Sequence, residues 1–363
     1  MKILLLIAKD GYSFVNQSTA LALGLKKIGI DSRLTRITDV YPEKEIREYD
    51  PDVVIGVGSW HQYHEFIRKP QELGYKTIPW IVSDGLMATY LAEYNELPLI
   101  LTTSEHCKDT FVQLGFRSDI IHVIYEAVDD SFWKPLSEEE VRDFARMISI
   151  QEPSLKELHL TFDIERLKAD GVPIIFTTGG SPTGKGAQEV ISALGRLDRS
   201  IPWIYMLKSW PSTDSFKYSI DELNLAGNLG ISDRIRYISG EFSKEFIRGL
   251  INCSDIYAAP SRGEGFGLPL VEAQMCGKPV VTLDATSTRE LVSHGKTGFI
   301  AKRDAALLDT RADVADLAVC FEKLLTNRTL ISEMGKNAYT ESRARFNPES
   351  IARAFLAEIK SQI

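Results

Sequence analysis

The sequence lacks the marks of a disulfide-rich, secreted or membrane-spanning protein. Its four cysteines are far apart and form no CxxC pair; they are Cys107, Cys253, Cys276 and Cys320. We interpret them as small buried side chains in a reducing compartment. No apolar run approaches the roughly 20 residues that span a bilayer. The first run, "KILLLIA", is followed at once by Lys9 and Asp10, so we expect a buried strand there and a soluble, cytoplasmic protein.

An excess of positive charge is also missing. The chain has 42 Lys and Arg against 50 Asp and Glu, for a net charge of −8. This balance argues against a protein that binds long nucleic acids. A small basic cluster comprises Lys26, Lys27, Arg33 and Arg36. We interpret it as a solvated face, which leaves membrane contact at most peripheral.

The dominant pattern is a short apolar run, a Gly or Asp turn, and then a helical segment. The first half contains "KILLLIA", "SRLTRI", "DVVIGVG", "TIPWIVS", "LILTTS" and "IIHVIY". The second half contains "VPIIFTT", "IPWIYML", "RIRYIS", "DIYAAP", "KPVVTL" and "TGFIA". Strands that alternate with helices indicate βαβ units and parallel sheets covered on both faces. The sequence therefore predicts an α/β protein with two doubly wound, Rossmann-like domains.

A charge-rich break separates the two sets of strands. The stretch from "LSEEEVRDFARMISIQ" to "DIERLKADG" contains no strand-like run, and we expect helices and a connector there. We place an N-terminal domain at residues 1–168 and a C-terminal domain at residues 169–345. Residues 346–363 form an amphipathic helix that we expect to cross back to the N-terminal domain, with Asn347 and Pro348 at its start.

The stretch "PSRGEGFGLPLVEAQMCGKPVV" places a glutamate on either side of a glycine-rich turn. It follows the strand "DIYAAP", and ligands of open parallel sheets bind beyond the carboxyl ends of the strands. Gly265 and Gly267 let the backbone approach an anion, and the following helix directs its N–H groups and dipole at it. Glu264 and Glu272 then face a ligand with an anionic centre and hydroxyl groups at both ends. A nucleotide sugar has this layout, and a carboxylate accepts two adjacent hydroxyls.

A second glycine-rich stretch, "FTTGGSPTGKGAQE", resembles the start of a P-loop. Gly186 stands where such a loop carries the Ser or Thr that binds Mg²⁺, so a P-loop nucleotide hydrolase is disfavoured. Lys185 remains a candidate for contact with a phosphate, because an ordinary lysine at a helix start opposes the helix dipole.

Taken together, these stretches resemble the retaining glycosyltransferases of the GT-B fold, specifically glycosyltransferase family 4. "EGFGLPLVEA" looks like the E-x7-E signature of that family, and "GKGAQE" resembles its phosphate loop. "HVIYEAVDDSFWKP" is similar to the end of the family's first domain, and "MGKNAYTESRARFNPESIA" to its C-terminal tail. The resemblance is strong over about 120–363 and diffuse before that. It implies two Rossmann-like domains that face a cleft.

The resemblance also implies roles for individual residues. Glu264 would contact the transferred sugar, Glu272 would hold the ribose hydroxyls, and Lys185 would stabilise the leaving diphosphate. The donor would further meet backbone groups of Gly265, Phe266, Gly267 and Leu268. The family usually carries an arginine about five residues before the lysine, where this chain has Gly179 and Gly180. We consider Lys208 and Arg262 as substitutes for that charge.

The remaining candidates lie at other strand ends. Tyr237 would border the base through its backbone, and Gly11 would let the donor phosphate approach. Tyr12 and His61 are candidates for the acceptor side. Asp84 stands after the fourth strand, where the family often has a histidine, and would bind an acceptor hydroxyl or assist the nucleophile. His61 and His64 lack an evident third ligand, so we predict no metal site.

The sequence thus predicts a retaining, metal-independent glycosyltransferase of hexosyltransferase type. It would need no cofactor, take a UDP- or GDP-linked sugar as donor, and transfer the sugar to an acceptor hydroxyl of a saccharide, a lipid-linked molecule or a small molecule. The alternatives are a donor-binding partner subunit without catalytic activity, and a phosphorylase or epimerase on the same fold.

Overall fold

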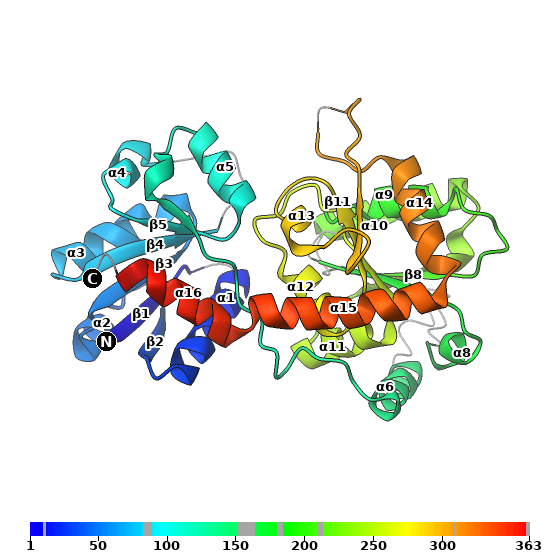
Figure 1. Cartoon of the computed structure of the whole chain (residues 1–363), viewed down its shortest axis with the longest axis horizontal. Helices are drawn as coiled ribbons and strands as arrows, with labels where there is room; N and C mark the ends of the chain where they lie inside the picture. Colours follow the sequence, from blue (N-terminus) through cyan, green and yellow to red (C-terminus); the bar gives the residue numbers. More distant parts are fainter. Residues whose placement is uncertain are drawn as a thin grey trace. The chain divides into compact units, whose positions relative to one another are not determined.

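The computed structural model describes residues 1–9, 12–82, 89–151, 164–179, 184–209, 213–307 and 309–360. By its internal contacts the chain divides into two compact units. Unit 1 comprises Met1–Phe132, Glu264–Leu268 and Arg343–Ile363, and unit 2 comprises Trp133–Gly263 and Pro269–Ser342. Each unit is built around a six-stranded parallel sheet (Figure 1). The prediction of two doubly wound α/β domains is confirmed.

The sheet of unit 1 has the order β2-β1-β3-β4-β5-β6. Its strands are β1 (Lys2–Ile7), β2 (Asp31–Arg36), β3 (Val53–Gly58), β4 (Lys76–Ile81), β5 (Ile100–Thr102) and β6 (Ile121–Val123). Its longer helices are α1 (Tyr12–Lys27), α2 (Glu43–Tyr49), α5 (Glu105–Gln113) and α16 (Pro348–Lys360), and the shorter ones include α3 (Lys69–Glu72), α4 (Leu91–Asn95) and η1 (Trp60–Gln62). The central strands are continuous apolar runs because helices cover both faces of the sheet.

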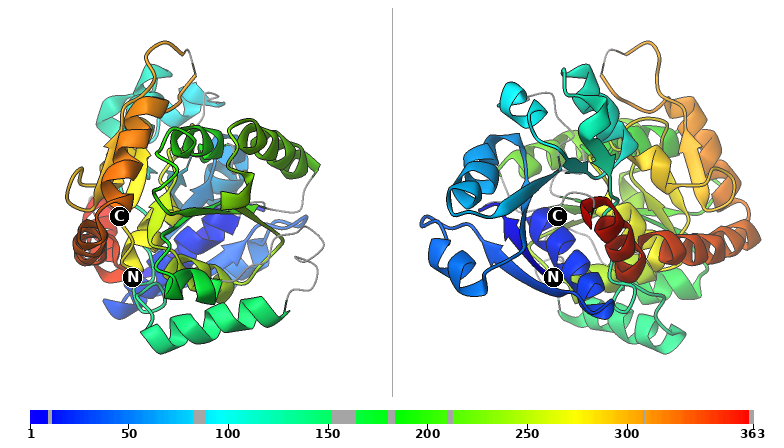
Figure 2. Two further views of the ribbon diagram at one scale, coloured as in Figure 1. Left: turned by 90° about the vertical axis from the view of Figure 1, so that its right-hand side faces the viewer. Right: turned by 60° about the vertical axis from the view of Figure 1, so that its left-hand side comes forward.

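The terminal helix α16 is part of the core of unit 1, as is the N-terminal strand β1 (Figure 2). The Asn347 side chain accepts a hydrogen bond from the backbone N–H of Ser350, 2.9 Å away, and Pro348 is the first helical residue. One face of α16 packs on α1, where Gly24 meets the carbonyl of Pro348 so closely that a methyl group would overlap it. The apolar positions of the last helix therefore fix it to the first sheet.

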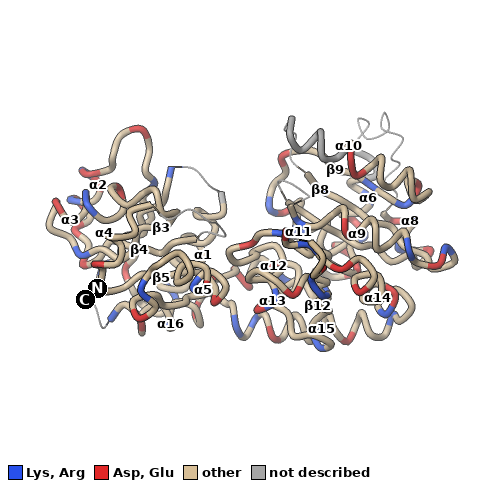
Figure 3. Tube along the Cα trace, turned by 90° about the horizontal axis from the view of Figure 1, so that it is seen from above, with Lys and Arg blue, Asp and Glu red and all other residues tan. Residues whose placement is uncertain are grey.

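The sheet of unit 2 has the order β12-β11-β10-β7-β8-β9. Its strands are β7 (Ile174–Thr178), β8 (Ile204–Ser209), β9 (Ile235–Ser239), β10 (Ile256–Ala258), β11 (Val280–Leu283) and β12 (Gly298–Ala301). Its helices include α6 (Glu138–Gln151), α8 (Ile164–Ala169), α9 (Ala187–Leu194), α10 (Thr213–Asn228), α11 (Lys244–Cys253), α12 (Leu268–Met275), α13 (Thr288–Leu291) and α14 (Val314–Leu325). Helix α15 (Arg328–Phe346) begins in unit 2 and ends in unit 1. Acidic and basic residues are interspersed along the backbone of both units (Figure 3).

The chain passes into unit 2 at Trp133, whereas the sequence analysis places the boundary at residue 168. Packing on α11 explains the difference. The backbone N–H of Leu136 donates to the Asn252 side chain at 2.8 Å, and Phe144 of α6 lies against Gly249. The described part of the charge-rich segment therefore belongs to unit 2, and Ala145, Ile148 and Ile164 are buried there.

Candidate functional site

In unit 2, strand order changes direction between β7 and β10, which are neighbours in the sheet but not in the sequence. Ligands of open α/β sheets bind beside such a switch point, at the carboxyl ends of the strands. The loops that leave β7 and β10 there are joined, since the backbone N–H of Arg262 donates to the carbonyl of Gly184 at 3.0 Å. Both glycine-rich stretches selected from the sequence therefore start at the same point of the sheet.

Lys185 lies in the loop after β7. Its side chain runs along the backbone of Gly179, where an added methyl group would be 2.9 Å from the lysine Cγ. Gly186 follows with a φ of +83° and forms the N-cap of α9. An added methyl group at Gly186 would lie 2.4 Å from the carbonyl oxygen of Pro260. The position that carries Ser or Thr in a P-loop thus has no room for either side chain, which gives a physical reason for the incomplete motif.

The two candidates for the missing cation differ in their surroundings. Arg262 pairs with the buried carboxylate of Glu189 through Nη2 at 2.7 Å, and Arg311 approaches the same carboxylate at 3.7 Å. The positive charge of Arg262 is therefore largely neutralised by Glu189 within the protein. Lys208 is the penultimate residue of β8 and only 4 % of its surface is exposed. Desolvation lowers the pKa of its ammonium to about 8. This geometry favours Lys208 over Arg262 as the phosphate-binding substitute.

Glu272 lies within α12, the helix that follows the glycine-rich turn. Desolvation raises the pKa of its carboxyl to about 7, and Lys244 at the start of α11 partly opposes this rise. Placing a carboxylate in such surroundings costs free energy that a pair of ligand hydroxyls would recover. Glu272 thus has the perturbed ionisation typical of a functional group.

Glu264, Gly265, Phe266, Gly267 and Leu268 are grouped with unit 1, although the chain on both sides of them belongs to unit 2. The carbonyl of Gly265 is buried in unit 1 and accepts three hydrogen bonds. Its donors are Ser104 Oγ at 2.7 Å, Thr103 Oγ1 at 3.1 Å and Cys107 Sγ at 3.2 Å. The sequence does not single out these three donors; its available signal is Ser104, a potential N-cap that ends the fifth predicted run, "LILTTS".

The other predicted residues are placed as follows. The side chain of Tyr237 is buried and donates its hydroxyl to the buried carboxylate of Glu222, so only its backbone remains for the predicted contact. His61 is exposed in η1, directly after β3, and β3 borders the point where strand order changes in the sheet of unit 1. Gly11, Asp84 and Gly180 lie outside the described residues, as does the side chain of Tyr12.

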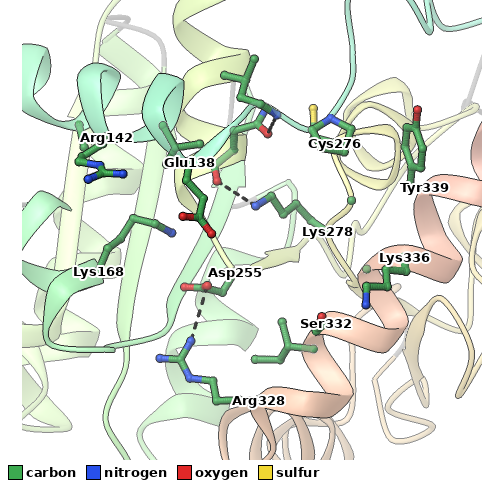
Figure 4. A pocket seen from close by; sticks show the side chains of 18 of the residues that line it. Glu138, Arg142, Lys168, Asp255, Cys276, Lys278, Arg328, Ser332, Lys336 and Tyr339 are labelled. Carbon is green, nitrogen blue, oxygen red and sulfur yellow. Dashed lines mark hydrogen bonds and ion pairs between the residues drawn. The ribbon is translucent and has the colours of Figure 1, made fainter.

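A cavity of about 920 Å³ opens at the opposite, amino edge of the unit 2 sheet (Figure 4). The Nζ of Lys278 donates to the carbonyl of Asn252 at 2.8 Å, and Lys168 donates to that of Cys253 at 3.0 Å. Both ammonium groups thus cap the C-terminal end of α11, while Arg328 pairs with Asp255 at 3.6 Å. The described residues that line this cavity include none of the predicted donor-site residues, so we do not assign the donor to it.

Over the ranges that the structure describes, no three His, Cys, Asp or Glu side chains are grouped as a metal site. Within the same ranges, no helix has both the length and the apolar character needed to cross a bilayer.

The architecture and these loops define the class, which is that of two-domain α/β proteins with the GT-B fold. Residues 161–341 match the family model described as "Glycosyl transferases group 1". HepE from Anabaena, solved in complex with UDP and glucose, has the same fold with a TM-score of 0.75 over 100 % of both chains at 18 % identity. A glycosyltransferase from Rickettsia africae gives a TM-score of 0.74 at 17 % identity, over 99 % of this chain and 98 % of that one.

Curated relatives match parts of the chain. A D-inositol 3-phosphate glycosyltransferase from Rhodococcus erythropolis is 26 % identical over 66 % of this chain and 48 % of its own length. An MMP alpha-(1->4)-mannosyltransferase from Mycolicibacterium hassiacum is 27 % identical over 74 % of this chain and 55 % of its own. The matches thus cover about half, or less, of the length of these relatives.

Proposed function

We propose that this protein is a glycosyltransferase that moves a sugar from a nucleotide-sugar donor to an acceptor hydroxyl. The observation that carries the proposal is the glycine-rich loop that leads from β10, at the switch point of unit 2, into α12, with Glu264 in the loop and Glu272 in the helix. The family match over residues 161–341 supports it, as do the curated relatives, which are named as glycosyltransferases.

Each residue has a role in this proposal. The raised pKa of Glu272 suits a carboxylate that gains hydrogen bonds when two ribose hydroxyls bind. As the sugar leaves, negative charge grows on the departing diphosphate. Lys185, Lys208 and the backbone N–H groups of the loop would stabilise that charge, which is the largest single contribution in many enzymes. Glu264 would hold the transferred sugar, and the acceptor would meet residues of unit 1 such as His61.

The finer features are part of the same proposal. Retention of configuration follows from the resemblance to the E-x7-E family. Independence from metal ions fits a diphosphate that is neutralised by lysines and backbone N–H groups. UDP is our first choice of nucleotide because HepE, which shares the fold, was solved with UDP and with UDP-glucose.

The test is a thermal-shift panel of UDP-, GDP-, ADP- and dTDP-sugars, with and without EDTA, on the wild type, Glu272→Ala and the exposed-site control Glu322→Ala. A ligand at 100 times its Kd stabilises by about 2.7 kcal/mol. We expect one nucleotide class to stabilise the wild type and the control regardless of EDTA, and not Glu272→Ala. Stabilisation by Mg²⁺-nucleoside triphosphates alone would contradict the proposal. NMR of the anomeric proton in the product then tests retention.

A further inference from the structure

The signature loop, residues Glu264–Leu268, is anchored by hydroxyl groups of unit 1 through the carbonyl of Gly265. Ser104 is the N-cap of α5, and its Oγ accepts the backbone N–H of Cys107 at 3.1 Å. The same oxygen donates its proton to the carbonyl of Gly265 at 2.7 Å. Thr103 adds a second O–H donor to this carbonyl. Both side chains are completely buried, so they form one fixed network with the loop.

An aromatic cluster fixes the next residue. Phe266 is 2 % exposed and lies 6.0 Å from the ring of Tyr125 and 5.7 Å from that of Phe346, measured between ring centroids. Tyr125 and Phe346 also meet edge to face at 5.7 Å. The carbonyl of Phe346 accepts the backbone N–H of Val128 at 2.9 Å, which ties the cluster to the backbone of unit 1.

Because a peptide is planar, the hydrogen bonds to the Gly265 carbonyl also fix the direction of the Phe266 N–H. The C=O and N–H of a trans peptide point in opposite directions, and the described part of the chain contains no cis peptide. Because the carbonyl of Gly265 points at the start of α5, the N–H of Phe266 in the same peptide plane points away from it. Glu264 is attached directly to the anchored residue, so its backbone is held as well.

We propose that Thr103 and Ser104 are positioning residues for the transfer reaction, since their hydroxyls orient the Gly265–Phe266 peptide and thereby set the Phe266 N–H and Glu264 toward the donor sugar. This inference rests on the proposed glycosyltransferase function. The two glutamates of the signature are held by different parts of the protein. Glu264 is in the anchored loop of unit 1, whereas Glu272 is in the part of α12 that belongs to unit 2. The proposed ribose contact of Glu272 and the proposed sugar contact of Glu264 therefore depend on different supports.

The test compares two threonines that are adjacent in the sequence. Thr103→Val removes the donor to Gly265 and keeps the shape of the side chain. Thr102→Val is the matched control, because Thr102 is equally buried and donates to the carbonyl of Ile81 at 3.1 Å, which is outside the loop. Ser104→Ala removes the second donor, and Ser104→Thr restores a hydroxyl. The measurements are thermal stability, UDP affinity by calorimetry, and kcat for transfer or donor hydrolysis.

We expect Thr102→Val and Thr103→Val to lower stability to a similar extent. Only Thr103→Val and Ser104→Ala should lower kcat, by roughly 10- to 100-fold, since small misplacements of reacting groups cost about that much. Their affinity for UDP should stay within about threefold of the wild type, because Lys185, Lys208 and Glu272, which make most of the proposed nucleotide contacts, belong to unit 2. Ser104→Thr should recover most of kcat.

Equal losses of kcat in Thr102→Val and Thr103→Val would overturn the inference, because the effect would then be one of general stability. A fall in UDP affinity that parallels kcat would overturn it too. If the wild type itself binds no nucleotide sugar, the proposed function fails instead, and the two failures are thereby distinguished.

Discussion

Replacement of Glu272 by glutamine should stabilise the ligand-free protein at alkaline pH. Desolvation raises the pKa of this carboxyl from 4.5 to about 7. The folded protein therefore binds the proton more tightly than the unfolded chain does, and stability falls as pH rises between these two values. The shift corresponds to about 3 kcal/mol once the pH exceeds 7. This is an upper limit, because solvent reaches part of the side chain.

Glutamine mimics the protonated acid and carries no such penalty. We expect Glu272→Gln to raise the free energy of unfolding by up to about 3 kcal/mol at pH 8.5, and by less than about 1 kcal/mol at pH 5. For a unit of this size, the larger value corresponds to a rise in Tm of about 6 to 12 °C. The same variant should lose stabilisation by the donor, because an amide cannot accept two hydroxyls as a carboxylate does.

The assay is thermal and urea unfolding of wild type, Glu272→Gln and the exposed-site control Glu322→Gln at pH 5 and pH 8.5, with and without nucleotide. A stabilisation of Glu272→Gln that is equal at the two pH values would refute the reasoning, because its source would not be ionisation. Unchanged donor binding in this variant would show that the carboxylate is not the ribose ligand.

Three further predictions concern single residues. The pKa of Lys208 is lowered to about 8, so the affinity for the donor diphosphate should fall between pH 7 and pH 9. Lys208→Met should make this affinity less dependent on pH, and identical pH profiles of variant and wild type would exclude Lys208 as a diphosphate ligand. Gly186→Ala combines a φ of +83° with overlap on the carbonyl of Pro260 and should cost roughly 2 to 5 kcal/mol in urea unfolding. Gly24→Ala would gain about 1 kcal/mol in an isolated helix, but its methyl group would lie 1.9 Å from the carbonyl oxygen of Pro348. A net loss of stability is therefore expected, and a gain would contradict the packing of α16 on α1.

The sequence by itself determined the architecture. The twelve predicted runs became twelve strands. Central strands such as β3 are apolar along their whole length because helices cover both faces of the sheet, whereas the edge strand β2 is mostly exposed. Glu264 and Glu272 were selected because a carboxylate on either side of a glycine-rich turn has no ordinary structural purpose, and the start of α16 was predicted because Asn and Pro have fixed preferences there. These are local properties, and residue order records them directly.

Only the tertiary structure decided which residues far apart in the sequence contact one another, and which charged side chains are paired or desolvated. Arg262 is paired with Glu189 and Lys208 is desolvated, although both looked like equivalent cations in the sequence. The hydroxyls of Thr103 and Ser104 donate to the carbonyl of Gly265, about 160 positions further along the chain. No local sequence pattern predicts this contact. Desolvation and long-range hydrogen bonds depend on which segments pack together, and residue order alone does not record that packing.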